Sequence, residues 1–277
     1  MIAAVAGCAQ KKKKNNKPAA NSVAANATPY VFDQPEEKQL PSDLTEISGI
    51  NYLPGNKLAA QQDEDGIIFI VDPLTGNIDS SYQFGPANDY EDIVAVGDYY
   101  YLLNSNGDIY KADRKNPSKR TTAMFTFGKK NKEFESLYAA GDGKHLVLIC
   151  KSCSGKDYSD AIDAYSFDLE KETYDPAPVY AIDEALVRKN FQMGKKGFRP
   201  SAAAIHPVEK KLYVLCSVGS VLLVANLSGE VENVYALSSK LYPQPEGIAF
   251  APNGDLYISN EGGRGYGTLL HLTYKAR

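Results

Sequence analysis

The fold is decided by the stretch PEGIAFAPNGDLYISNE, residues 245–261. It places Glu246 two residues before an apolar residue, continues through a Pro-Asn-Gly turn and ends in an apolar strand. Four earlier segments open in the same way: Ser48-Gly49-Ile50, Glu91-Asp92-Ile93, Glu135-Ser136-Leu137 and Ser201-Ala202-Ala203. The intervals between the five openings are 43, 44, 66 and 45 residues. Such self-similarity at a nearly fixed period indicates a repeat architecture.

Each repeat predicts four short strands. A tight turn follows the opening strand, and after it come an apolar second strand, a third strand and a fourth strand with an aromatic–apolar cluster such as Phe125-Thr126-Phe127. Four strands in a unit of this length are typical of a propeller blade. We therefore predict an all-β fold, a five-bladed β-propeller with four-stranded blades.

The last repeat ends at Arg277 after only three strands. Its fourth strand must come from elsewhere in the chain, and Tyr30-Val31-Phe32 matches the fourth-strand pattern. We expect this N-terminal strand to complete the last blade and close the ring, because closure removes exposed sheet edges.

The first residues differ in character from the repeats. Val5-Ala6-Gly7-Cys8 resembles the lipobox of bacterial lipoproteins, in which the leader is cut before a cysteine that then carries lipid. Residues 9–29 are polar and rich in Lys, Asn and Ala, as in flexible tethers. We predict a signal-peptide remnant at 1–7, a tether at 8–29 lipid-anchored to a membrane through Cys8, and a propeller domain at 30–277.

Composition limits the partners. The net charge of −4 disfavours nucleic acid, and the sequence has no run of 18 apolar residues that would span a bilayer. Cys150 and Cys153 form a lone CxxC pair, for which a local disulfide and two free thiols are both open alternatives.

The repeat motifs also resemble a known family. Tyr90-Glu91-Asp92-Ile93, Phe134-Glu135-Ser136-Leu137, Pro200-Ser201-Ala202 and Pro245-Glu246-Gly247-Ile248, in this order, are similar to the SdiA-regulated family of bacterial envelope β-propellers. The resemblance extends over roughly residues 40–274. It implies a propeller and export to the bacterial cell envelope, periplasmic or surface-exposed, and it implies no particular reaction.

The opening strands of a propeller line its central channel, so their polar residues form a ring. Glu91, Glu135 and Glu246 would then converge, and carboxylates of this kind suit Ca²⁺. We predict these three as metal ligands, with Ser48 and Ser201 as weaker ligand-binding partners. In the alternative interpretation, each Glu accepts hydrogen bonds and joins neighbouring blades.

A second polar layer is expected where the second strands end. Its predicted ligand-binding residues are Asn104, Asn260 and Glu261, together with Arg264 in the glycine-rich loop 262–267. The alternative for Arg264 is an exposed position in a hairpin.

Two functions fit the sequence. His145, His206 and His271 are scattered, and the usual nucleophile and phosphate-binding motifs are missing from the sequence, which favours a non-catalytic envelope protein. Its ligand would be a small molecule, a glycan or a partner protein. The alternative is a metal-dependent hydrolase, lactonase-like or phosphoesterase-like, that uses the channel carboxylates.

Overall fold

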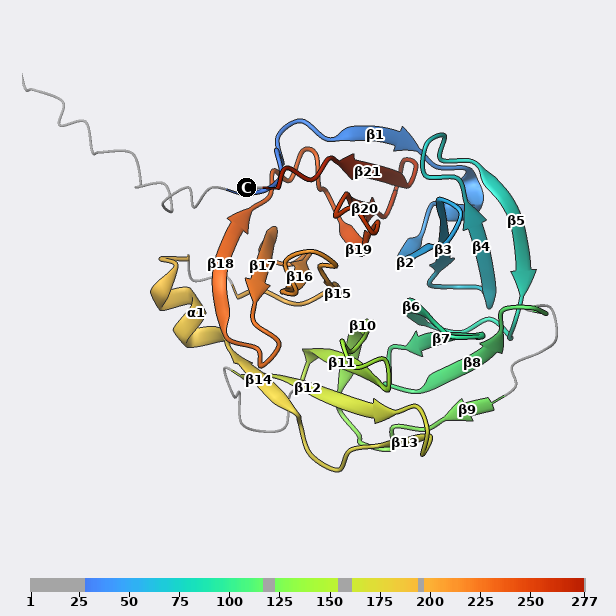
Figure 1. Cartoon of the computed structure of the whole chain (residues 1–277), viewed down its shortest axis with the longest axis horizontal. Helices are drawn as coiled ribbons and strands as arrows, with labels where there is room; N and C mark the ends of the chain where they lie inside the picture. Colours follow the sequence, from blue (N-terminus) through green and yellow to red (C-terminus); the bar gives the residue numbers. More distant parts are fainter. Residues whose placement is uncertain (1–27, 117–122, 154–160, 194–196, 277) are drawn as a thin grey trace, which may run out of the picture.

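The computed structural model describes residues 28–116, 123–153, 161–193 and 197–276. These residues form five antiparallel sheets arranged around a central axis, so the chain is a five-bladed β-propeller (Figure 1). Cys8 and most of the predicted tether lie outside the described residues. Within the described ranges, no helix has the length and apolarity needed to cross a bilayer.

The blades follow one another along the chain. The first contains β2 (Ile47–Leu53), β3 (Lys57–Gln62), β4 (Ile67–Val71) and β5 (Ile78–Gln83). The second contains β6 (Tyr90–Val96), β7 (Tyr99–Asn104), β8 (Ile109–Asp113) and β9 (Ala123–Phe125). The third contains β10 (Glu133–Ala139), β11 (His145–Ser152), β12 (Ala161–Asp168), β13 (Thr173–Tyr174) and β14 (Tyr180–Asp183). The last two strands of this blade both pair with β12.

The fourth and fifth blades complete the ring. The fourth contains β15 (Ala202–Ile205), β16 (Leu212–Cys216), β17 (Val221–Ala225) and β18 (Val231–Ala236). The fifth contains β19 (Pro245–Phe250), β20 (Leu256–Asn260), β21 (Thr268–Leu272) and β1 (Glu36–Gln39). The 3₁₀ turn η1 (Ser42–Leu44) leads into β2, and the helix α1 (Glu184–Asn190) lies at the rim between the third and fourth blades (Figure 1). Asp183 caps α1 by accepting a hydrogen bond from Leu186 N at 2.8 Å.

An N-terminal strand closes the ring as predicted, but the predicted position of that strand, Tyr30–Phe32, was wrong. The closing strand is β1, which pairs with β21 from Glu36↔His271 to Gln39↔Thr268. The sequence of β1, EEKQ, is polar because an outermost strand faces solvent on most of its surface. Tyr30 is instead a buried anchor, whose hydroxyl donates to Gly254 O at 2.6 Å and lies 2.7 Å from His206 Nε2.

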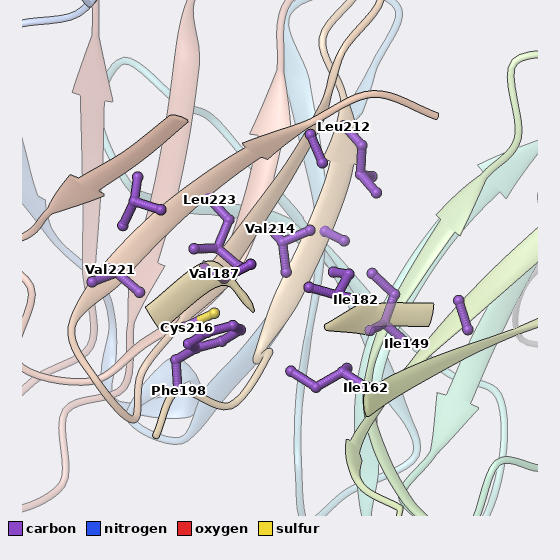
Figure 2. Packing of buried hydrophobic residues seen from close by; sticks show 14 of the residues in the cluster. Ile149, Ile162, Ile182, Val187, Phe198, Leu212, Val214, Cys216, Val221 and Leu223 are labelled. Atoms are coloured by element: carbon purple, nitrogen blue, oxygen red, sulfur yellow. The ribbon is translucent and has the colours of Figure 1, made fainter. Parts of the chain in front are cut away.

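Each pair of neighbouring blades shares its own apolar core. The buried side chains of the described residues form five clusters, and each cluster draws on two adjacent blades. Figure 2 shows the cluster between the third and fourth blades, where Ile149 and Ile162 face Val214 and Leu223, with Phe198 beneath them. Sheets that bury both faces in this way hold the inner strands at a fixed distance from the axis.

The propeller has two distinct faces. On the mouth face, the inner strands β2, β6, β10, β15 and β19 begin and the second strands of the blades end. On the far face, turns join the inner strands to the second strands. The chain enters on the far face, since Lys275 N donates to Pro29 O there at 3.0 Å.

Candidate functional site

The three predicted metal-ligand glutamates share one backbone feature. The pairing of the inner strand with the second strand slips between Tyr90 and Asp92, between Phe134 and Ser136, and between Pro245 and Gly247. The residues left out of register are Glu91, Glu135 and Glu246. A β-bulge of this kind re-aims the side chain of the extra residue. In the inner strands of a propeller, side chains that follow the strand alternation face the adjacent blades. The bulges take these glutamates out of that alternation.

Five half-buried carboxylates gather at this end of the channel, and we call them the acidic mouth. They come from the fifth, first and second blades and are Glu46, Asp63, Glu91, Glu246 and Glu261. Burial is the main cause that raises the pKa of Glu91 to about 8, and negative charge on Asp89 and Glu246 adds to it. Burial likewise raises the pKa of Glu246 to about 7.

Two further members of the acidic mouth have raised pKa values for the same reasons. Burial, followed by a hydrogen bond to Glu46, raises the pKa of Glu261 to about 8. Burial and the nearby charge of Glu46 raise the pKa of Asp63 to about 6. The acidic mouth therefore carries carboxyl groups that keep part of their protons near neutral pH, which is typical of functional sites.

Glu135 is paired with Lys151, the cation next to the acidic mouth. Lys151 Nζ contacts Glu135 Oε1 and lies 3.6 Å from Glu133 Oε1. The Glu135 side chain is only 9% exposed, and no donor among the described residues forms a hydrogen bond with its other oxygen, Oε2. The charge of Lys151 also lowers the pKa of Glu91 and of Glu246, so this ammonium acts as a built-in counter-ion.

The CxxC pair lies directly beside this lysine. Cys150 and Cys153 form a disulfide across the end of β11, so of the two alternatives left by the sequence, the local disulfide is present. Lys151 is held within this short loop.

The hydroxyl groups of Ser48 and Ser201 form hydrogen bonds between neighbouring blades. Ser48 Oγ donates to Tyr90 O at 3.1 Å, and Ser201 Oγ donates to Pro245 O at 2.7 Å. Each accepting carbonyl belongs to the residue just before a bulged glutamate of the next blade. The serines therefore fix the backbone from which Glu91 and Glu246 project.

Asp92 makes a similar connection that the sequence reasoning missed. Its buried carboxylate accepts hydrogen bonds from Ile93 N at 2.8 Å and from Leu137 N of the third blade at 2.7 Å. A Cβ at Gly49 would lie 2.5 Å from Asp92 Oδ1, so only glycine allows the first blade to approach this closely. Burial raises the pKa of Asp92 well above its usual range, and the two N–H groups oppose that shift.

The second polar layer also forms contacts within the protein. Asn104 Nδ2 donates to Asp89 O at 2.6 Å, and Asn260 Nδ2 donates to Thr268 Oγ1 at 3.0 Å. Glu261 belongs to the acidic mouth, while Arg264 is exposed on the 262–267 loop of the mouth face. Among the predicted ligand-binding residues, Glu261 and Arg264 thus lie where a bound molecule can reach them.

The channel behind the mouth contains a cavity of about 240 Å³. It is lined by all five inner strands, through residues such as Ile50, Val94, Leu137, Ala204 and Ala249. In the part of the chain that the structure describes, no group of three or more His, Cys, Asp or Glu residues is arranged to hold a metal ion. The predicted roles of Glu91, Glu135 and Glu246 as metal ligands remain predictions.

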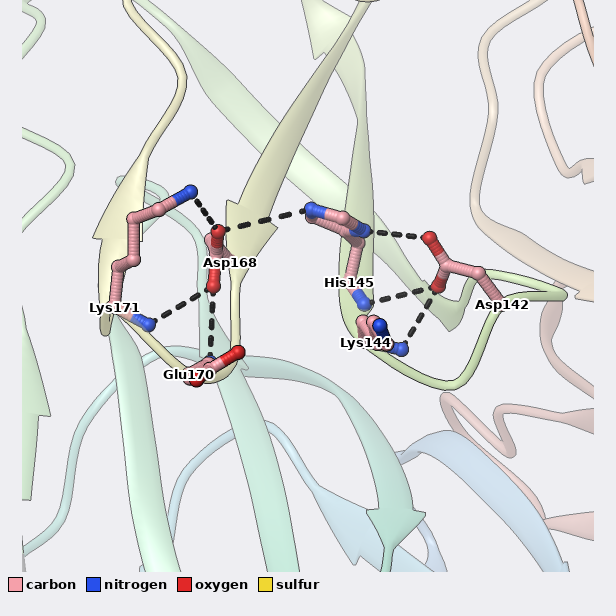
Figure 3. Close-up of polar contacts among 6 residues, drawn as sticks. All are labelled: Asp142, Lys144, His145, Asp168, Glu170 and Lys171. Carbon is pink, nitrogen blue, oxygen red and sulfur yellow. Dashed lines mark hydrogen bonds and ion pairs between the residues drawn. The ribbon is translucent and has the colours of Figure 1, made fainter.

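The three histidines lie away from the acidic mouth. On the far face, His145 Nδ1 lies 2.6 Å from Asp142 Oδ2, and Lys171 Nζ lies 2.6 Å from Asp168 Oδ2 (Figure 3). The Lys171 side chain holds the pKa of Asp168 down to about 2. His206 is buried against Tyr30 and His271 lies 3.3 Å from Asp255, so these side chains form structural contacts.

Comparisons with known proteins support the fold and identify no family for the chain. No protein-family model matches the chain, and no curated protein matches it. Among solved structures, it resembles Myxococcus xanthus glutaminyl cyclase with a TM-score of 0.61 at 12% identity, covering 87% of this chain and 94% of that one. It also resembles a luciferin-regenerating enzyme, with a TM-score of 0.53 at 12% identity and coverage of 87% and 95%.

A third solved structure is a protein of unknown function from Bacteroides thetaiotaomicron. Its TM-score is 0.54 at 12% identity, and the match covers 81% of this chain and 55% of that one. At such identities the likeness shows a shared propeller fold, and function has to be argued from the site.

Proposed function

We propose that this protein is a non-catalytic binding protein whose ligand carries positive charge and enters the acidic mouth. The observation that carries the proposal is the gathering of Glu46, Asp63, Glu91, Glu246 and Glu261, half-buried, at one end of the channel. Burying like charges together is unfavourable unless a cation or a proton compensates them. A cationic ligand would supply that compensation, beyond what Lys151 provides next to Glu135.

A melting screen tests this proposal. The protein is melted at pH 8 with and without Ca²⁺, Mg²⁺ and organic amines, and the screen is repeated with Glu246→Gln. A ligand that binds only the folded state raises the melting temperature in proportion to the logarithm of its concentration. If no cation raises it at pH 8, the proposal is wrong. A rise that is equally large in Glu246→Gln would place binding outside the acidic mouth.

We also propose that the protein is an envelope lipoprotein of the SdiA-regulated kind, anchored through Cys8. The lipobox-like segment and the ordered series of repeat motifs support this assignment. In that setting the ligand would be a small molecule, a glycan or a partner protein that meets the mouth face. Labelling with a lipid precursor, in cells that express the chain behind a complete signal peptide, tests the anchor: incorporation is expected with the native Cys8 and should be lost in Cys8→Ser. Equal labelling of both forms would contradict it.

A metal-dependent hydrolase is the second candidate, and one observation favours it. Several half-buried carboxylates gather at the acidic mouth, so one that does not bind the metal ion is placed to act as a general base. Ca²⁺ held near Glu91, Glu135 and Glu246 would supply a Lewis acid for water activation. A panel of lactones and phosphoesters with added Ca²⁺ tests this reading. Turnover is expected to fall in Glu135→Gln, and unchanged turnover would remove Glu135 from the mechanism.

A further inference from the structure

Negative charge at the acidic mouth is distributed over three neighbouring blades. The fifth blade contributes Glu246 and Glu261, the first contributes Glu46 and Asp63, and Asp89 and Glu91 belong to the second. A Ca²⁺ ion needs six to eight oxygen atoms within about 2.6 Å of one point. Among the described residues, no group of three or more His, Cys, Asp or Glu residues could hold a metal ion. Charges spread along a rim match a ligand whose own positive charges are also spaced apart.

Hydrogen-bond acceptors without donors lie in and beside the acidic mouth. Glu135 Oε2 and Asp63 Oδ1 are buried, and no hydrogen bond from the described residues reaches either atom. The other oxygen of Glu135 contacts Lys151, whose charge acts on Glu91 and Glu246, so this carboxylate lies beside the acidic mouth. A carboxylate oxygen without a donor accepts hydrogen bonds from an ammonium group, which brings three N–H donors together with its positive charge. These oxygens therefore fit an ammonium ligand.

Next to the acidic mouth, the chain itself holds an ammonium group between carboxylates. Lys151 is an aliphatic ammonium on a methylene stem, and it is held between the carboxylates of Glu135 and Glu133. It satisfies one oxygen of Glu135 and leaves the carboxylates of the fifth, first and second blades to other partners. A ligand with further ammonium groups would pair with these remaining carboxylates in the same way.

We propose that the acidic mouth binds a linear aliphatic polyamine, a chain of methylene groups with several ammonium groups. The inference rests on the proposed function, because it specifies the chemical class of the cationic ligand. One ammonium group would pair with Glu246 and Glu261, and another with Glu91 and Asp63. Methylene spacers let successive charges meet carboxylates of successive blades.

The experiment is a calorimetric titration of the full chain at pH 7.5 with spermidine, butylamine and Ca²⁺ as separate probes. Spermidine is expected to bind at least about tenfold more tightly than either of the others, a difference of about 1.4 kcal/mol. The double variant Glu91→Gln/Glu246→Gln should weaken spermidine binding at least about tenfold. Asp98→Asn, an exposed carboxylate on the far face, is the matched control and should leave binding unchanged.

A second readout separates this site from loose attraction to an acidic surface. Pairing with an ammonium group lowers the pKa of the buried carboxyl groups, so binding should release protons. The heat of binding will then depend on the ionisation enthalpy of the buffer, and this dependence should be lost in the double variant. Binding heats that are independent of the buffer would contradict the inference.

The possible failures can be told apart. If Ca²⁺ binds at the acidic mouth and spermidine does not, the polyamine is the wrong ligand class and the proposed cation site stands. If the double variant binds spermidine as tightly as the native chain, the site lies elsewhere and the inference is overturned. If none of the probes binds, both the inference and the proposed function fail. Glutamine matches glutamate in shape, and a melting curve of each variant verifies that it folds.

Discussion

Replacing Glu91 with glutamine is expected to stabilise the protein at alkaline pH. Burial raises the pKa of Glu91 from 4.5 to about 8, which means that the folded state disfavours the ionised carboxylate. The folded state binds more protons than the unfolded state between these two values, so the contribution of Glu91 to stability falls as the pH rises from about 4.5 to about 8. Glutamine has no charge to bury and removes this dependence.

The size of the effect follows from the shift. Each pKa unit corresponds to about 1.4 kcal/mol, which gives an upper bound of about 4 kcal/mol at pH 8. The side chain is half-buried, and screening by solvent reduces the value to about 1–2 kcal/mol. For a chain of this length, that raises the melting temperature by about 3 °C.

Calorimetric melting of native protein and Glu91→Gln at pH 5 and pH 8 measures this difference. The gain should be clear at pH 8 and small at pH 5, where the folded carboxyl group is already protonated. Asp142→Asn on the far face should change stability in the opposite direction, because backbone N–H groups and His145 lower the pKa of Asp142. A Glu91→Gln variant that melts at or below the native temperature at pH 8 would refute the reasoning.

Three other predictions concern the stability of the propeller and its orientation at a membrane. Asp92→Ala removes the acceptor of Leu137 N and should lower the free energy of unfolding by about 2–3 kcal/mol, measured by urea denaturation. Tyr30→Phe leaves the carbonyl of Gly254 without this donor and should cost about 1–2 kcal/mol in the same assay. If Cys8 carries lipid, the far face is expected to meet the membrane more often than the mouth face, because the described chain begins on the far face. A fluorophore at Arg264→Cys should then be quenched by spin-labelled lipid headgroups less than one at Lys275→Cys.

Each of these three predictions has its own control or contrary outcome. Asp98→Ala removes an exposed carboxylate and should change the free energy of unfolding by less than about 0.5 kcal/mol. If Asp92→Ala loses no more than this control, the role of Asp92 in joining the second and third blades is contradicted. An unchanged urea midpoint in Tyr30→Phe would show that the N-terminal anchor is dispensable. Stronger quenching at position 264 than at position 275 would reverse the proposed orientation.

The blades could be predicted from the sequence because each of them is a local pattern. Turn residues and apolar strands recur in the same order, and the structure follows them from β2 to β21. The closing strand could not be located in this way. Its residues Glu36–Gln39 face solvent on most of their surface, so they carry no apolar pattern, whereas the aromatic Tyr30 matched that pattern while serving as an anchor.

The candidate site was predictable only in part. Glu91, Glu246 and Glu261 were identified from their positions within the repeat, and they lie together at the acidic mouth. Glu46 was missed because it precedes the repeat motif, although its position two residues before Ser48 places it at the start of β2. The bulges were not predictable, because a slip of one residue between paired strands depends on both strands and on the neighbouring blade.

Asp92 occupies a role that the sequence analysis considered only for the glutamates of the ring. The sequence left open whether acidic residues join the blades or face a ligand. The bulge divides these roles between adjacent positions in β6: Asp92 joins the second blade to the third through Leu137 N, and Glu91 is left at the acidic mouth. Two adjacent acidic residues thus differ in their surroundings: one joins two blades and the other lies at the acidic mouth.

The two serines of the ring explain why it is not five-fold symmetric. A glutamate at every opening strand would add repulsion to a site in which burial already raises the pKa of Glu91 and Glu246. Ser48 and Ser201 are neutral, and each donates to the carbonyl just before a bulged glutamate of the following blade. They therefore lower the charge of the ring and also fix the backbone that presents the carboxylates. On this argument, the serines are positioning residues for the acidic mouth.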